Sequence, residues 1–413
     1  QVQISTIWHR NSACKRFKTL SGKRRNALIM QSGGCTNVLN SSLVGIIDEA
    51  SQSGAFDHVY GASLGLEGFF EDQVIDVSNV PRQTLNRIAS APGAALGSTR
   101  RRLTEDDLPV VFDRLADRNI SHWFIAGGND SATTGHTLTV ESKARGYDLT
   151  VINIPKTIDN DIVMTDHCPG YGSAARFVAL ATMGAGRDAE SMRTAAPITI
   201  IEVMGRDAGW LAASAILAKQ DERDAPHVIC VPEVPVVEDI FLEQMEDAYR
   251  RYGFAVAVVS ENARGSNGVL GGEQDPNLVD DFGHEYYDGP ARYLAGLIGK
   301  SLGVRARYEK PGTIQRSMMS TTSRSDSQEA EMAGRAAVKA ALNGESGVMV
   351  TLARALGPGY SCGTGLAPLE LVGGKVRLMP TEYLDPDSGN ISQEFIKYLK
   401  PLVGRLPRLA RFE

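Results

Sequence analysis

The chain has 413 residues, of which 42% are hydrophobic and 22% charged, the composition of an ordinary folded globular protein. This length exceeds what one hydrophobic core usually supports, so we expect two domains. The net charge of −6 gives no basic excess to neutralise nucleic-acid phosphates, and no apolar stretch approaches the about 18 residues of a membrane span.

Five scattered cysteines without close pairs predict reduced thiols and a cytoplasmic location rather than a disulfide framework or a zinc site. The seven histidines show no metal-ligand spacing. Residues 1–25 are basic and polar, with no apolar core that would make a signal peptide. We expect them to form an N-terminal extension.

After residue 25, short β-rich runs alternate with amphipathic segments. The predicted strands are Ala27–Gln31, His122–Ala126, Leu149–Ile154, Ile198–Val203, Val228–Val231, Ala255–Val259 and Val348–Leu352. Apolar strands separated by helical patterns indicate parallel sheets covered by helices on both faces. One helix is predicted with an apolar face behind a capping pair, from Thr104, Asp107, Leu108, Val111, Phe112 and Leu115.

Two glycine-rich turns follow predicted strands. The first is Gly33-Gly34, and the second is Gly127–Ser131. Paired glycines let a backbone approach an anion, and the helix that follows each turn offers free N–H groups. Asn129 and Asp130 would then face a metal, its waters or the phosphate. A tight strand-to-helix turn explains the first pair equally well, and an ordinary helix cap explains the second.

The segment Pro155–Asp161 falls in the loop that ends a buried strand. In an open α/β sheet, loops at the carboxyl ends of strands form the ligand crevice. One of its carboxylates, Asp159 or Asp161, can act as a general base on a hydroxyl while the other helps hold magnesium. Lys156 suits a phosphate. A solvated turn whose lysine pairs with its own acids is the alternative, and the buried strand before it makes that alternative weaker.

Further polar residues follow later strands. Arg206 is placed to stabilise a transferring phosphoryl group, because a helix start is a poor place for a purely structural arginine. Glu261 can bind sugar hydroxyls or cap the next segment. Arg307 and Arg316 can clamp a phosphate monoester, with a solvated basic loop as the alternative.

Two other patterns concern local structure. Gly184–Ala189 matches the dinucleotide pattern Gly-x-Gly-x-x-Ala, but it follows a segment that is typical of a helix, so we interpret it as a helix break. Residues 369–378 alternate around Gly373-Gly374 and predict a β-hairpin at the edge of a sheet.

Taken together, these motifs resemble those of the phosphofructokinase family over most of the chain, from about Ala27 to about Leu366. The resemblance implies an α/β fold of two Rossmann-like three-layer domains with mostly parallel sheets and the active site in the cleft between them. It assigns residues 26–170 to the phosphate donor, with 317–365 returning to that domain. It assigns residues 171–316 to fructose 6-phosphate, with 366–413 packing on them.

The resemblance also implies a role for each matching residue. The reacting groups would be Asp159 as the base, with Thr157, Lys156 and Arg206. The donor would be bound by Gly33, Gly34, Arg100, Gly128, Asp130, Ser131 and Lys156. The sugar phosphate would be bound by Thr157, Asp159, Met204, Gly205, Arg206, Glu261, Arg307 and Arg316. The metal would be held by Asn129, Asp130 and Asp161, although the family usually has aspartate at the first of these positions.

Asp130 and Lys156 also indicate the donor. ATP-using members tend to have glycine at both positions, whereas pyrophosphate-using members resemble this chain. The resemblance therefore implies phosphoryl transfer from pyrophosphate to the 1-hydroxyl of fructose 6-phosphate, releasing phosphate, with Mg²⁺ as cofactor. It implies a homodimer or homotetramer without a nucleic-acid or membrane partner. The alternatives are an ATP-dependent member, a non-catalytic sugar-phosphate-binding subunit, and a nicotinamide oxidoreductase based on Gly184–Ala189 alone.

Overall fold

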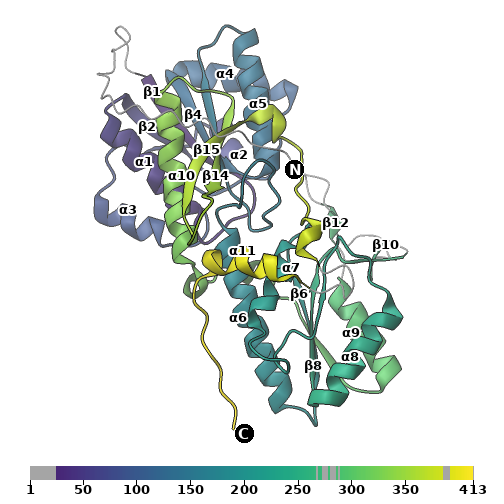
Figure 1. Ribbon diagram of the computed structural model, residues 1–413. Helices are drawn as coiled ribbons and strands as arrows, with labels where there is room; N and C mark the ends of the chain where they lie inside the picture. Colours follow the sequence, from purple (N-terminus) through teal and green to yellow (C-terminus); the bar gives the residue numbers. More distant parts are fainter. Residues whose placement is uncertain are drawn as a thin grey trace.

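The computed structural model describes residues 25–266, 268–271, 278–279, 285–286, 289–384 and 391–412. The expected N-terminal extension, except Arg25, lies outside these residues. Among the helices described, none is long and apolar enough to cross a membrane. The chain forms two lobes, each built on one main sheet, and helix α11 (Gln393–Val403) lies where the lobes meet (Figure 1).

The first lobe contains a seven-stranded sheet. Its strands are β1 (Arg25–Gln31), β2 (Phe56–Ala62), β3 (Val74–Asp76), β4 (Ile120–Gly127), β5 (Thr150–Pro155), β14 (Val348–Arg354) and β15 (Cys362–Pro368). They lie in the order β15-β14-β5-β4-β1-β2-β3, with parallel inner pairs and antiparallel strands at both edges. Ala126 pairs with Ile154 and Gly127 with Pro155, so the loops after β4 and β5 leave the sheet side by side.

Helices cover both faces of this sheet, because alternate strand residues are apolar on each side. Ala27 and Ile29 of β1 belong to one buried cluster, and Leu28 and Met30 belong to the cluster on the other face. One face is covered by α1 (Leu39–Ser53), α3 (Arg82–Ala89) and α10 (Arg324–Leu342). The other is covered by α2 (Gly65–Phe70), α4 (Leu108–Asp117) and α5 (Asn129–Ala144).

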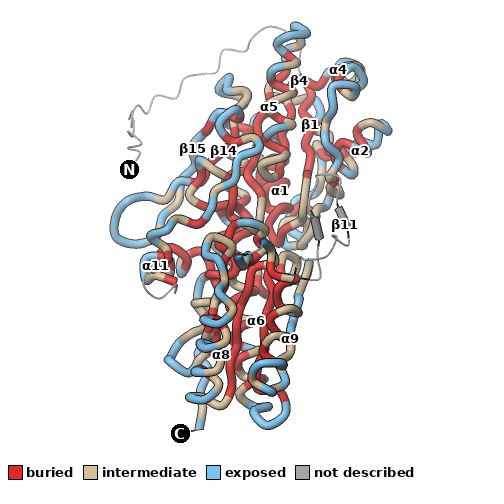
Figure 2. The backbone as a smooth tube through the Cα atoms, turned by 90° about the vertical axis from the view of Figure 1, so that its right-hand side faces the viewer, coloured by how far each residue is buried: buried red, intermediate tan, exposed pale blue. Residues whose placement is uncertain are grey.

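The second lobe has a parallel four-stranded sheet in the order β13-β6-β8-β7. Its strands are β6 (Ile198–Val203), β7 (Val228–Cys230), β8 (Ala255–Ser260) and β13 (Ala306–Glu309). Its helices are α6 (Tyr171–Ser191), α7 (Trp210–Ser214), α8 (Glu238–Tyr252) and α9 (Pro290–Leu302). Buried residues form the interior of each lobe, and exposed residues lie at its outer surface (Figure 2).

Short elements complete the described chain. Two small antiparallel pairs are β9 (Arg264–Gly265) with β10 (Gly268–Val269), and β11 (Leu278–Val279) with β12 (Glu285–Tyr286). The 3-10 turns are η1 (Glu105–Asp107), η2 (Ala215–Ala218), η3 (Gly312–Arg316), η4 (Met319–Thr321), η5 (Leu369–Leu371) and η6 (Thr381–Tyr383).

The fold class is confirmed: both main sheets are mostly parallel and covered by helices. All seven predicted strands are present within one or two residues. The capping pair Thr104 and Asp107 is also confirmed, since the Asp107 carboxylate accepts hydrogen bonds from the backbone N–H and the hydroxyl of Thr104. After the second lobe the chain returns to the first, where α10 packs on α1 and β14 joins β5.

Two local predictions were wrong. Residues 369–378 form no hairpin: η5 covers Leu369–Leu371, and the antiparallel edge strand is β15, which pairs with β14. The alternating pattern suggested a strand, but the Arg377 side chain points inward and donates hydrogen bonds to the backbone carbonyls of Asn160 and Asp166. Gly184–Ala189 is no helix break either, since α6 continues through it, and Gly186 packs closely against Ala225.

Candidate active site

A cleft of about 340 Å³ lies between the lobes. It contains every predicted site residue except Gly205 and Arg307: Gly33, Gly34, Arg100, Gly128, Asn129, Asp130, Ser131, Lys156, Thr157, Asp159, Asp161, Met204, Arg206, Glu261 and Arg316. These residues come from both lobes. The cleft also contains Ser32, Cys35, Ile158, Asp207, Asn262, Arg264, Val269 and Lys310, which were not predicted as site residues.

The loop after β1 brings the two lobes into contact. A Cβ atom on Gly34 would lie 2.3 Å from Nη1 of Arg316, so only glycine lets that guanidinium from η3 rest against the loop. Arg316 was predicted for the sugar phosphate, yet it lies beside the predicted donor loop. The loop itself is held from the first lobe, because Gly33 N–H donates to Thr99 O at 2.8 Å and the Ser98 hydroxyl donates to Gly33 O at 2.6 Å.

The loop after β4 leaves room next to the start of α5. A Cβ atom on Gly128 would meet only Lys156 O, at 3.7 Å, so the missing side chain leaves space on the cleft side. Asp130 is the second residue of α5 and lines the cleft. A helix start attracts anions, but a carboxylate at that place repels a phosphate unless a cation lies between them.

Lys156 is buried at the bottom of this side of the cleft, with 3% of its surface exposed. Its ammonium donates to Gly34 O at 2.6 Å and therefore lies against the first glycine loop, while its backbone carbonyl faces Gly128 of the second. The pKa of Lys156 is lowered to about 8, chiefly by burial, with smaller contributions from the neighbouring Arg316 and Arg206. The ammonium has hydrogen-bonding capacity left after this one bond, so it is suited to bind an anion.

Three carboxylates also line the cleft: Asp159, Asp161 and Glu261. Burial raises the pKa of Asp161 to about 6, and the neighbouring Asp159 raises it as well. Burial likewise raises the pKa of Glu261 to about 7, again with a contribution from Asp159. Arg206 Nε lies 4.0 Å from Asp159 Oδ2 and brings one positive charge to the group. Such a cluster is arranged to take up protons or cations.

Glu261 also shapes the turn that carries Arg206. Its Oε1 accepts hydrogen bonds from the backbone N–H groups of Gly205, at 3.2 Å, and Arg206, at 3.1 Å. Arg206 has a φ of 50°, in the left-handed region that non-glycine residues rarely adopt. Gly205 therefore serves the site through its backbone, while the neighbouring Met204 N–H is held by the Gln315 amide oxygen at 3.1 Å.

Arg307 does not line the cleft of this chain. It lies on β13, and its guanidinium donates to Asp188 at 2.8 Å. Lys310, three residues further on, does line the cleft, and its ammonium lies 2.7 Å from Oε1 of the buried Glu202. Both cations lie in one basic stretch of the sequence. Arg307 is within β13, and Lys310 follows its last residue and faces the cleft.

The residues present fit a magnesium ion. Asp130 and Asp161 both line the cleft and offer carboxylate oxygens, the ligands that Mg²⁺ prefers. The Asp161 carboxylate is buried, and its Oδ2 accepts a long hydrogen bond, 3.5 Å, from the Asn129 amide nitrogen. A buried carboxylate with so weak a partner gains most from a nearby cation. Asn129 donates to this acid instead of adding a charge.

Replacing Asn129 with aspartate should lower the Mg²⁺ concentration that half-saturates activity by about tenfold, roughly 1.4 kcal/mol, because a second charge would replace the amide beside Asp161. The measurement is a Mg²⁺ titration at pH 8, well above the pKa of about 6 of Asp161. Asn86→Asp on the exposed face of α3 is the control. Equal half-saturation in the two variants would exclude Asn129 from the metal site.

Sequence reasoning missed Arg377, which binds the loop after β5 from the side away from the cleft. Its guanidinium donates to the carbonyls of Asn160, at 2.7 Å, Asp166, at 2.8 Å, and Thr165, and its backbone N–H donates to Asp161 O at 2.7 Å. The guanidinium also lies over the Trp210 ring, 4.6 Å from its centroid. The fork of five donors explains why arginine suits this place.

Arg377→Met should therefore lower kcat by about 10²-fold, the cost of misplacing reacting groups by around 1 Å. The kcat of Arg377→Lys should lie between those of Arg377→Met and the unmodified protein, because lysine can reach fewer of the three carbonyls. Steady-state kinetics and the thermal midpoint should be measured together. A lower midpoint with an unchanged kcat would show that Arg377 stabilises the fold without positioning the loop.

The cleft combines a buried lysine beside two glycine loops, a cluster of carboxylates and an arginine that faces them. This arrangement defines the class of protein: a phosphotransferase with its site between two α/β lobes.

The comparisons with known proteins agree with this class. The family model described as "Phosphofructokinase" matches residues 26–341. A pyrophosphate–fructose 6-phosphate 1-phosphotransferase of Halomonas elongata is 34% identical over 387 residues, 92% of each chain. Its counterpart in Xanthomonas campestris is 36% identical, over 92% of this chain and 91% of the other. The crystal structure of a pyrophosphate-dependent phosphofructokinase of Nitrosospira multiformis has a TM-score of 0.85 and 30% identity over 95% of both chains. The chain belongs to the phosphofructokinase family.

Proposed function

We propose that the protein transfers a phosphoryl group reversibly between pyrophosphate and the 1-hydroxyl of fructose 6-phosphate, giving fructose 1,6-bisphosphate and phosphate. The observation that carries this proposal is the buried Lys156, whose ammonium lies against Gly34 in the donor side of the cleft. Together with Asp130 it fills space that a nucleoside would need and supplies charge for a bare pyrophosphate. The names of the relatives from Halomonas and Xanthomonas support the same donor.

In this proposal Asp159 takes the proton from the 1-hydroxyl as the hydroxyl oxygen attacks the nearer phosphorus of pyrophosphate. Arg206, which faces Asp159 at 4.0 Å, stabilises the charge that develops on the transferring group. Thr157 holds the loop, because its hydroxyl accepts the backbone N–H of Asp159 at 3.1 Å. A phosphoanhydride is exchanged for an ester and free phosphate, so the reaction runs readily in both directions.

The cofactor we propose is Mg²⁺, held by Asp161 and Asp130 with Asn129 beside them. Bound there, it would neutralise pyrophosphate charge and offset the repulsion between phosphate and Asp130. Gly33, Gly34, Arg100, Gly128 and Ser131 complete the donor side. The first lobe, residues 26–170 with 317–365, would then serve the donor, and the second, residues 171–316 with 366–413, the sugar phosphate.

On the sugar side we propose Met204, Gly205, Glu261 and Arg316, with Arg307 completing the site from a neighbouring copy. Arg307 lies outside its own cleft, so a homodimer or homotetramer is the arrangement in which it could reach a sugar phosphate. We further propose that the protein acts in cytoplasmic carbohydrate breakdown, where sugar phosphates are the substrates.

One experiment decides the donor: purified full-length protein is assayed with fructose 6-phosphate and either Mg-pyrophosphate or Mg-ATP. Turnover with pyrophosphate and little with ATP is expected. Turnover with ATP alone would establish the ATP-dependent alternative. Absence of turnover with either donor, together with tight sugar-phosphate binding, would establish the non-catalytic alternative.

A further inference from the structure

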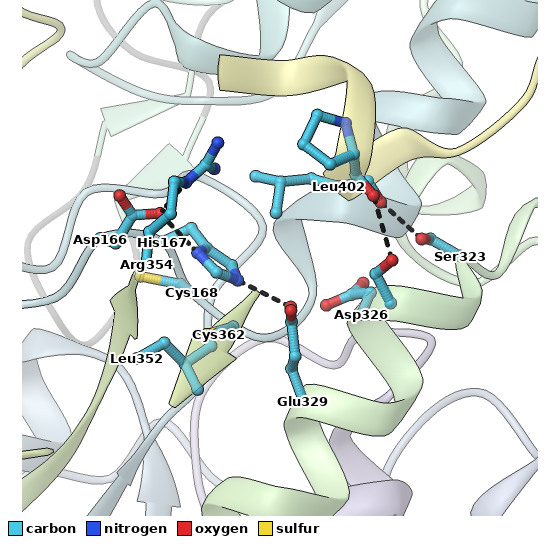
Figure 3. Close-up of polar contacts among 12 residues, drawn as sticks. Asp166, His167, Cys168, Ser323, Asp326, Glu329, Leu352, Arg354, Cys362 and Leu402 are labelled. Carbon is cyan, nitrogen blue, oxygen red and sulfur yellow. Dashed lines mark hydrogen bonds and ion pairs between the residues drawn. The ribbon is translucent and has the colours of Figure 1, made fainter. Parts of the chain in front are cut away.

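A second cluster of chemically versatile side chains lies away from the cleft, where three distant segments meet. His167 belongs to the loop between β5 and α6, Glu329 to α10 and Cys362 to the start of β15. The imidazole is buried, with Nδ1 2.8 Å from Asp166 Oδ2 and Nε2 2.8 Å from Glu329 Oε2 (Figure 3). None of these residues is used in the phosphoryl transfer proposed above.

The cluster has the ligand set of a borderline-soft divalent metal. A ring nitrogen of His167, a carboxylate oxygen of Glu329 and the sulfur of Cys362 all lie within 4.8 Å of one another. In a tetrahedral zinc site with bonds of about 2.0–2.3 Å, ligand atoms are about 3.3–3.8 Å apart, so modest side-chain shifts would close the site. Nitrogen and sulfur ligands favour Zn²⁺ over Mg²⁺.

The surroundings of His167 orient it as a ligand. Asp166 accepts a hydrogen bond at Nδ1, which fixes the tautomer and directs Nε2 toward Glu329. Asp166 is itself held by Arg354, 3.3 Å away. A carboxylate on the far nitrogen is the usual outer-shell partner of a metal-binding histidine. Glu329 is also held, because the Tyr360 hydroxyl donates to its other oxygen, Oε1.

Zn²⁺ would displace two protons from the cluster, which leave to solvent. One is the proton shared between His167 Nε2 and Glu329, and the other is the thiol proton of Cys362. A neutral imidazole nitrogen and a thiolate are the forms of these side chains that ligate a metal.

We propose that His167, Glu329 and Cys362 form a zinc-binding site, with Asp166 as the positioning residue for the histidine and water as the fourth ligand. Cys362 is partly exposed, which gives the ion a path from solvent. The site would link the loop between β5 and α6, which contains His167, to α10 and β15. Its function is therefore structural: it would stabilise the loop whose carbonyls Arg377 binds.

The test uses Co²⁺, a spectroscopic substitute for Zn²⁺, added to the full-length protein in excess Mg²⁺. Binding through sulfur should produce a thiolate-to-cobalt charge-transfer band that Zn²⁺ abolishes by displacement. Cys35→Ser is the matched control, because Cys35 lines the cleft and is the other partly exposed cysteine among the described residues. The band should persist in Cys35→Ser and disappear in Cys362→Ser.

The affinity for Zn²⁺ should fall at least tenfold in Cys362→Ser and 10- to 100-fold in Asp166→Asn, as expected for outer-shell partners. Circular dichroism checks that each variant is folded. The proposal is overturned if the unmodified protein gives no band. A band that survives Cys362→Ser or vanishes in Cys35→Ser would also overturn it, because the metal would then be elsewhere.

Discussion

Replacing Asp159 with asparagine should lower kcat by about 10²- to 10⁴-fold, the usual contribution of a general base. The amide keeps the size of the side chain but cannot take the proton of the attacking hydroxyl. Asp159 lines the cleft, 4.0 Å from Arg206, and its charge raises the pKa of Asp161 and Glu261. Its loop is anchored by Thr157 and the carbonyls that Arg377 binds, so the substitution should leave the backbone in place.

Forward and reverse rates give this prediction a sharp check. Asp159 takes the proton in one direction and returns it in the other, so kcat should fall in both directions. Asp247→Asn, on the exposed surface of α8, should change neither. Removing one of three crowded acids should also lower the pKa of Glu261 and Asp161. A kcat reduced less than tenfold, with substrate affinities unchanged, would assign the base to another residue.

Much of the cleft could be predicted from the sequence because its parts follow strands. Gly33-Gly34, Gly127–Ser131 and Pro155–Asp161 each come directly after an apolar run, and parallel strands place such loops at one edge of a sheet. The order of strands β1, β4 and β5 then makes the three loops neighbours. The sequence alone could not supply that order, which depends on which strands pair.

The residues that were missed or misplaced depend on contacts between distant segments. Arg377 was assigned to a hairpin, because alternation in the sequence says nothing about the loop carbonyls it binds 211 to 217 positions earlier. Arg307 and Lys310 are three residues apart, and their contacts with Asp188 and Glu202 decide which one faces the cleft. No short spacing in the sequence could predict the cluster of His167, Glu329 and Cys362, since its members come from three separate segments of the chain.

Replacing Lys156 with methionine should lower kcat/KM for pyrophosphate by about 10- to 150-fold, which corresponds to the about 1.5–3 kcal/mol of a hydrogen bond to a charged group. Methionine fills a similar volume without the charge that faces the donor. In the unmodified protein kcat/KM for pyrophosphate should also decline above about pH 8, because burial lowers the pKa of Lys156 to that value and the ammonium loses its proton as the pH rises.

Two comparisons separate this role from a general loss of structure. The decline above pH 8 should disappear in Lys156→Met, since the group that titrates is gone, while the apparent affinity for fructose 6-phosphate should change little. Lys143→Met, at the exposed end of α5, should behave like the unmodified protein. If Lys156→Met retained both its affinity for pyrophosphate and the decline above pH 8, the donor would be bound elsewhere in the cleft. In that case Arg316, which rests on the same glycine loop, is the cation to substitute next.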